Sequence, residues 1–106
     1  MLGRAFRWMA AFTALLAVCA CAQHRSAAQP GIERGMPIYA RECAACHGAQ
    51  GSGTQIGPAL RNLRARLSYS AARAVILDPS PPMPKLYPGR LTRGQVDDVT
   101  AYVETL

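Results

Sequence analysis

Apolar residues near the end of the chain recur at helical intervals, which is the clearest pattern in the sequence. Thr92 stands ahead of them as a candidate cap, and Gln95 three residues later can complete a capping box. The apolar stripe comprises Val96, Val99, Tyr102, Val103 and Leu106. Together these features predict a C-terminal amphipathic helix.

Two earlier segments also have helical spacing. Pro37 favours a start of the first helix near Met36, or a kink there, because proline fits only the first turn of a helix; the end is expected near Cys46. Its apolar residues are Ile32, Met36, Tyr39, Ala40 and Cys43. The second helix is predicted over residues 68–77, where Asp78-Pro79 stops it. Its apolar face is expected to hold Leu67, Ala71, Ala74 and Val75.

The stretches between these helices are loops. Residues 48–58 are rich in glycine, and residues 80–89 contain five prolines if Pro79 is counted, which excludes a helix or a central strand. No alternating run is long enough for a strand, and no internal repeat is visible. The predicted fold class is therefore all-α, small and rich in loops.

The first 22 residues have the layout of a secretory signal peptide. Residues 1–8 carry Arg4 and Arg7 and no acid, and residues 9–22 are almost wholly apolar and end in small residues. This run is too short to cross a bilayer comfortably, and no second apolar segment of about 18 residues follows. We expect an exported protein of the bacterial periplasm.

Two processing signals overlap at the end of this segment. Residues 20–22 (Ala-Cys-Ala) fit ordinary cleavage before Gln23, whereas residues 18–21 (Val-Cys-Ala-Cys) resemble a lipoprotein box in which Cys21 becomes acylated. Both remain open, so the domain is expected to be soluble or lipid-anchored through Cys21. Residues 23–30 are small and polar, which is typical of a flexible tether.

The net charge of the chain and the length of its domain give further information on its partners and its stability. The formal net charge of +6 becomes +4 once the signal is removed, and the basic residues are scattered, with no basic run and no set of aromatic residues for base stacking. This pattern disfavours nucleic acid as a partner. It is typical of an ordinary solvated surface, and the residual positive charge can also steer association with an acidic protein. The remaining domain, residues 31–106, has fewer than 80 residues, so its core needs a covalent or metal staple.

The motif Cys43-Ala44-Ala45-Cys46-His47 can supply that staple. Cysteines three apart on a helix lie on one side about a turn apart, so each thiol can form a thioether with one haem vinyl group. His47 then follows as an iron ligand. The sequence thus predicts one covalently bound haem c per chain.

Other uses of the two cysteines remain as alternatives. A thioredoxin-like redox pair needs a preceding strand in a βαβ unit, and no strand is predicted. A zinc site needs more ligands, and those left to it are His24 and Cys21, outside the domain. A plain disulfide is the third alternative.

With this motif, residues 31–106 resemble the class I cytochrome c family. Gly35 and Tyr39 look like the pair at which the N-terminal helix of that family crosses the C-terminal helix, and Val99 and Tyr102 look like the matching pair. Glycine lets two backbones approach, and the aromatic rings fill the crossing. The resemblance implies a cytochrome c fold, with three to four helices packed around one covalently bound haem.

The resemblance also assigns roles to two loop residues. Pro58 is expected to accept the N–H of the His47 imidazole through its carbonyl, which fixes the ring plane. Met83, between prolines in the loop before the last helix, is implied as the sixth iron ligand. His47 and Met83 together raise the reduction potential and close the iron to other ligands. One departure is Leu86, where many relatives have an aromatic residue.

The function that this implies is that of a non-enzymatic single-electron carrier between periplasmic or membrane redox partners, which dock transiently. It would act as a monomer or, alternatively, as a cytochrome subunit docked to a dehydrogenase or oxidase. A haem peroxidase or ligand sensor is a further alternative that needs an open sixth site. Around the exposed haem edge we expect Lys85 and some of Arg61, Arg64, Arg66 and Arg90.

Overall fold

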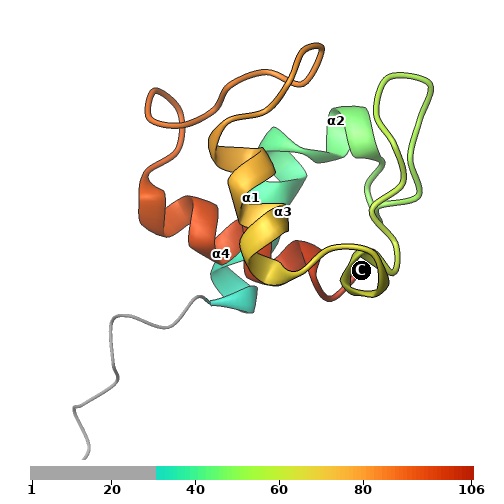
Figure 1. Cartoon of the computed structure of the whole chain (residues 1–106), viewed down its shortest axis with the longest axis horizontal. Helices are drawn as coiled ribbons and strands as arrows, with labels where there is room; N and C mark the ends of the chain where they lie inside the picture. The colour runs from blue at the N-terminus through green and yellow to red at the C-terminus, as the bar shows by residue number, and fades with distance from the viewer. Residues whose placement is uncertain (1–30) are drawn as a thin grey trace, which may run out of the picture.

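The computed structural model describes residues 31–106, so the expectations for the signal peptide (1–22), for Cys21 and for the tether (23–30) lie outside the described residues. The described part contains helices and loops and no strand, which confirms the all-α class (Figure 1). The helices are α1 (Ile32–Glu42), α2 (Ala44–His47), the 3₁₀ helix η1 (Leu63–Ala65), α3 (Tyr69–Leu77) and α4 (Arg93–Val103). Within this part, no helix combines the length and the apolar character that a bilayer span requires.

The crossing of α1 and α4 is the most extensive contact between elements (Figure 1). A Cβ on Gly35 would lie 2.1 Å from the backbone oxygen of Asp98, so only glycine permits this approach. The rings of Tyr39 and Tyr102 fill the space beside it, with centroids 5.4 Å apart and planes at 56°. Val99 is fully buried in the same crossing. The helix pair expected from the resemblance is therefore present.

Helix α1 starts at Ile32 and carries Pro37 inside it, so the predicted start near Met36 is wrong by four residues, while the alternative of a kink there stays a prediction. Contacts from α4 explain the early start, since Asp98 Oδ1 accepts the Gly31 N–H at 2.7 Å and the Asp98 carboxylate also binds the Arg34 guanidinium. These bonds satisfy groups that a helix N-terminus otherwise leaves open. The predicted apolar face is wrong in part, because Ile32 and Met36 are about half exposed. Ile38, which the spacing missed, is in the core.

The predicted single helix through the cysteine motif is also corrected. Helix α1 ends at Glu42, Cys43 lies at the junction with a φ of −118°, and α2 resumes at Ala44. Cys43 is bonded on both sides of the break: its N–H donates to the Tyr39 carbonyl of α1, and its carbonyl accepts the N–H groups of Cys46 and His47 in α2. The first thiol is thus held at the helix junction and the second within the single turn of α2.

Helix α4 agrees with its prediction, and α3 agrees only in extent. Thr92 and Gln95 form the full capping box of α4, and the Ser68 hydroxyl accepts the N–H of Ala71 at the start of α3. In α3, however, Ala72 and Ile76 are the buried residues. The predicted face is wrong because its side chains Leu67 and Val75 are exposed at 38% and 47% and border the cavity described below.

Candidate functional site

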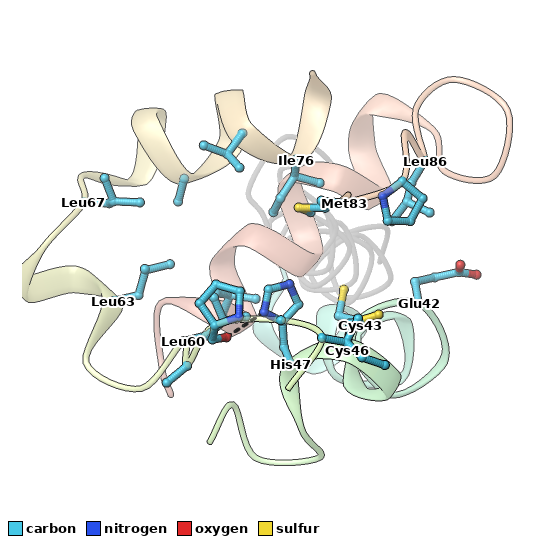
Figure 2. Close-up of a pocket in the computed structure, with 18 of the residues that line it drawn as sticks. Glu42, Cys43, Cys46, His47, Leu60, Leu63, Leu67, Ile76, Met83 and Leu86 are labelled. Carbon is cyan, nitrogen blue, oxygen red and sulfur yellow. Dashed lines mark hydrogen bonds between the residues drawn. The ribbon is translucent and has the colours of Figure 1, made fainter. Parts of the chain in front are cut away.

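A cavity of about 430 Å³ opens between the cysteine motif, η1, α3 and the loop before α4 (Figure 2). Its volume falls within the roughly 300–1,000 Å³ of pockets that enclose small molecules. Most of the wall is aliphatic. The aliphatic residues include Leu60, Leu63, Leu67, Val75, Ile76, Leu86 and Val103. Such a wall suits a large, flat, apolar ligand.

His47 is buried and presents its ring to the cavity from α2 (Figure 2). Its Nδ1 lies 2.8 Å from the carbonyl oxygen of Pro58. Because a carbonyl can only accept, Nδ1 carries the proton, and the lone pair is left on Nε2. An imidazole fixed in this tautomer is prepared to donate Nε2 to a metal.

Pro58 belongs to the proximal loop, defined here as residues 48–62. This loop is hydrogen-bonded to the cysteine motif and packs against it. The Thr54 hydroxyl donates to the Cys46 carbonyl at 2.6 Å and accepts the N–H of Ile56 at 3.0 Å. A Cβ on Gly57 would lie 2.6 Å from the same carbonyl, so the loop backbone presses directly on the motif. The sequence alone does not reveal the role of Thr54, since a threonine in a glycine-rich loop gives no spacing signal.

Cys43 and Cys46 are free thiols at one end of the cavity (Figure 2). Burial raises the pKa of the Cys43 thiol to about 11, and the nearby Glu42 carboxylate adds to the shift. The neutral thiol is the form that suits an apolar wall. The pair is not joined as a disulfide, the third alternative considered for it.

Met83 lies on the opposite wall from His47 (Figure 2). It is partly buried and belongs to the distal loop, defined here as residues 78–91. The Met83 N–H donates to the Ser80 carbonyl at 3.2 Å, which makes a local turn among the prolines. The other methionine of the described residues, Met36, lies on the exposed face of α1 and does not line the cavity.

Two charged side chains besides these groups line the cavity, Glu42 and Arg66. Among the candidates for the haem edge, Arg66 lies in the cavity wall, and its guanidinium donates to the carbonyls of Ala59 and Arg61. Lys85 instead pairs with Asp78 in the distal loop. The placement of basic residues around an exposed haem edge stays a prediction.

The donor set fits a haem better than the alternatives. Two thiols stand beside an imidazole with a free Nε2, and a thioether sulfur faces it across an aliphatic cavity, as a His and Met ligand pair requires. Residues 31–106 contain no cluster of three or more His, Cys, Asp or Glu side chains that could hold another metal ion. The same residues form no strand, so a thioredoxin-like setting for the cysteines is also missing.

Comparison with known proteins gives one family. Residues 32–106 match the family described as Cytochrome c. A curated relative, the cytochrome c-553-like protein of Synechocystis sp., is 36% identical over 75 residues, which cover 70% of this chain and 68% of that protein. The similarity thus spans nearly all of the described residues.

Two solved structures have the same fold. The c-type cytochrome XoxG of Methylobacterium extorquens AM1 is 26% identical with a TM-score of 0.61, over 70% of this chain and 48% of that one. The dihydro-heme d1 dehydrogenase NirN is 35% identical with a TM-score of 0.60, over 67% of this chain and 16% of that one. The chain therefore spans about half of XoxG and a small part of NirN.

Proposed function

This chain belongs to the cytochrome c family, whose members carry electrons on covalently bound haem c, and from this premise we propose how its own residues hold the haem. Cys43 and Cys46 each add their S–H across one vinyl group and become thioethers. His47 would hold the iron through Nε2, and Met83 would hold it through its sulfur.

The contact between His47 and Pro58 carries this proposal. Donation from Nδ1 to the Pro58 carbonyl leaves Nε2 free to bind a metal and fixes the plane of the ring. When bound, the haem iron supplies a site that gains or loses one electron. His47 and Met83 would both hold the iron, so no ligand would have to leave during that change, and the aliphatic wall would keep water out.

The test is an optical spectrum of the holoprotein, made in a host that attaches haem to cysteines. We expect a low-spin spectrum in both oxidation states and, in the ferric state, the charge-transfer band of methionine-ligated haem. Met83→Ala should abolish that band and allow carbon monoxide to bind the ferrous iron. Met36→Ala, the matched control on the exposed face of α1, should change neither property. A colourless mature chain with two free thiols would contradict the proposal.

The partners are redox proteins that dock transiently, with a positive net charge on this chain steering an acidic partner. The chain works as a monomeric shuttle in the bacterial periplasm, and residues 1–22 direct its export to that compartment. It remains either soluble, after cleavage before Gln23, or anchored through an acylated Cys21. The mass of the mature N-terminus distinguishes these two forms, since acylation adds lipid to Cys21.

A second arrangement is a cytochrome subunit or docked domain of a larger oxidoreductase. The observation in its favour is that the matched part of NirN is only 16% of that dehydrogenase, so this fold also occurs inside a larger redox protein. Purification from the native host separates the two arrangements. A shuttle elutes alone, and a subunit elutes with its complex.

A further inference from the structure

Glu42 is the acidic residue directly before the cysteine motif, and its carboxylate is almost completely buried. Its side chain is 5% exposed, and it lies at the same end of the cavity as Cys43 and Leu86, with the carboxylate turned away from His47 (Figure 2). Burying a carboxylate costs free energy unless cations compensate it. The cations that contact Glu42 therefore indicate the structural role of its negative charge.

Two arginines supply the compensation. Arg41 donates from Nε to Glu42 Oε1 at 2.8 Å, but Arg41 is its neighbour in sequence and so this bond ties no distant segments together. Arg90 belongs to the distal loop, and a terminal guanidinium nitrogen lies 2.6 Å from Oε2. That contact lacks hydrogen-bond geometry, so it acts as an ion pair. It joins the distal loop to the end of α1.

The distal loop has few other ties to the haem motif. Its other ion pair, Lys85 with Asp78, stays within the loop and is exposed on both sides. The N–H of Arg90 donates to the Leu86 carbonyl at 2.7 Å, which couples Arg90 to a leucine that packs into the cavity wall three residues after Met83. Among the ion pairs of residues 31–106, Glu42 with Arg90 alone connects this loop to the segment that carries Cys43.

We propose that Glu42 and Arg90 form a positioning pair that holds the distal loop against the haem motif and thereby keeps Met83 on the iron. The inference rests on the ligation by Met83 proposed above. The pair does not touch the iron. It lowers the fraction of molecules in which the loop swings out and the sixth position opens.

Opening of the sixth position can be measured with imidazole, which competes with Met83 for ferric iron. The apparent affinity of such a competitor rises with the fraction of open molecules. In the ferric holoprotein, Glu42→Gln and Arg90→Ala should each tighten imidazole binding on the order of tenfold, within the usual range of coupling between two sites. Both should weaken the methionine charge-transfer band, and Arg90→Lys, which keeps the charge, should bind imidazole more like the wild type than Arg90→Ala does.

Two variants serve as controls. Asp98→Asn breaks the comparably buried ion pair between Arg34 and α4, which lies outside the cavity wall, and should lower stability without changing imidazole affinity. Lys85→Ala breaks the exposed pair within the distal loop and should change neither property. Wild-type affinity in both Glu42→Gln and Arg90→Ala would overturn the proposal, and so would an equal effect of Asp98→Asn. A wild-type protein without the charge-transfer band would instead overturn the Met83 ligation itself.

Discussion

The proximal and distal loops face each other across the cavity and are held in different ways (Figure 2). Backbone hydrogen bonds connect the residues of the proximal loop to one another and to neighbouring segments. They include Gly51 to Gly48, Gly53 to His47, Thr54 to Gly57, Leu60 to Gly51 and Asn62 to Leu106, each N–H to carbonyl. The distal loop has fewer backbone hydrogen bonds, among them Met83 to Ser80 and Arg90 to Leu86. It relies more on its prolines, on two leucines that are buried to 98% or more, Leu86 and Leu91, and on the ion pair of Arg90 with Glu42.

The difference follows from what each loop presents. An imidazole binds metal only through a ring nitrogen in the ring plane, so His47 needs a directional partner, and hydrogen bonds are directional. A methionine has a flexible, unbranched side chain with a soft sulfur, so it tolerates a loop placed by packing and charge. The proximal loop therefore fixes the orientation of the His47 ring, and the distal loop fixes the position of Met83.

The largest effect should come from the packing of the distal loop. Leu86→Ala deletes a side chain that is 2% exposed and should lower the free energy of unfolding by about 3 kcal/mol. Guanidinium denaturation of the ferric holoprotein measures it. A loss below about 1 kcal/mol would mean that the prolines place this loop without the leucine.

Adding one methyl group to each loop is the next test. Gly57→Ala puts a Cβ 2.6 Å from the Cys46 carbonyl and should cost about 2 kcal/mol through overpacking. Gly89→Ala in the distal loop meets nothing within 4 Å and should stay within about 1 kcal/mol of zero. The same denaturation experiment compares them. Equal losses in the free energy of unfolding would contradict the inference that the proximal loop is packed more tightly than the distal loop.

Asp98→Asn, a substitution outside both loops, should lower the free energy of unfolding without changing the cavity. The size of this effect should depend on pH. Hydrogen bonding to Arg34 lowers the pKa of Asp98 below its usual value near 3.8, and the Gly31 N–H acts in the same direction. The stabilisation by Asp98 is therefore present above about pH 4 and is lost as the pH falls through the lowered pKa. Asp98→Asn should cost about 1.5 kcal/mol at pH 7.

This pH dependence can be followed by denaturing the wild type and Asp98→Asn at several pH values. The gap between their free energies of unfolding should narrow below pH 4, because the wild-type carboxylate is then protonated as well. A gap that is constant from pH 7 to pH 3 would show that the charge on Asp98 contributes nothing.

The smallest effect should come from one hydroxyl of the proximal loop. Thr54→Val keeps the shape and removes the donor to the Cys46 carbonyl, so it should cost about 1 kcal/mol. The same variant should broaden the proton resonances of the haem-bound His47, since the loop that presents Pro58 loosens. Unchanged resonances and unchanged stability would show that the backbone hydrogen bonds suffice without Thr54.

Local patterns in the sequence predicted the features that depend on neighbouring residues. The capping box of Thr92 and Gln95, the apolar stripe of α4 and the loop between α3 and α4 agree with the structure, because each is decided within a few positions. The spacing of Gly35 and Tyr39 also found the helix crossing, although only through the resemblance to a family.

Features that depend on distant contacts were out of reach. Helix α1 begins early because Asp98, far along the chain, binds the Gly31 N–H. The apolar face of α3 was misassigned because periodicity cannot separate a side chain that faces the core from one that borders a cofactor cavity, as Leu67 and Val75 do. Likewise, no pattern pairs Glu42 with Arg90, since the two meet only after the distal loop has folded back.

The bond from the Gly31 N–H to Asp98 has a mechanical consequence. Gly31 does not line the cavity, and its amide is hydrogen-bonded to α4 rather than to either ligand loop. Tension applied to the chain upstream of Gly31, by a tether, a fused protein or a surface linkage, is therefore transmitted into the α1 and α4 pair. A linkage on the amino-terminal side therefore acts first on this helix pair and not on the loops that present Pro58 and Met83.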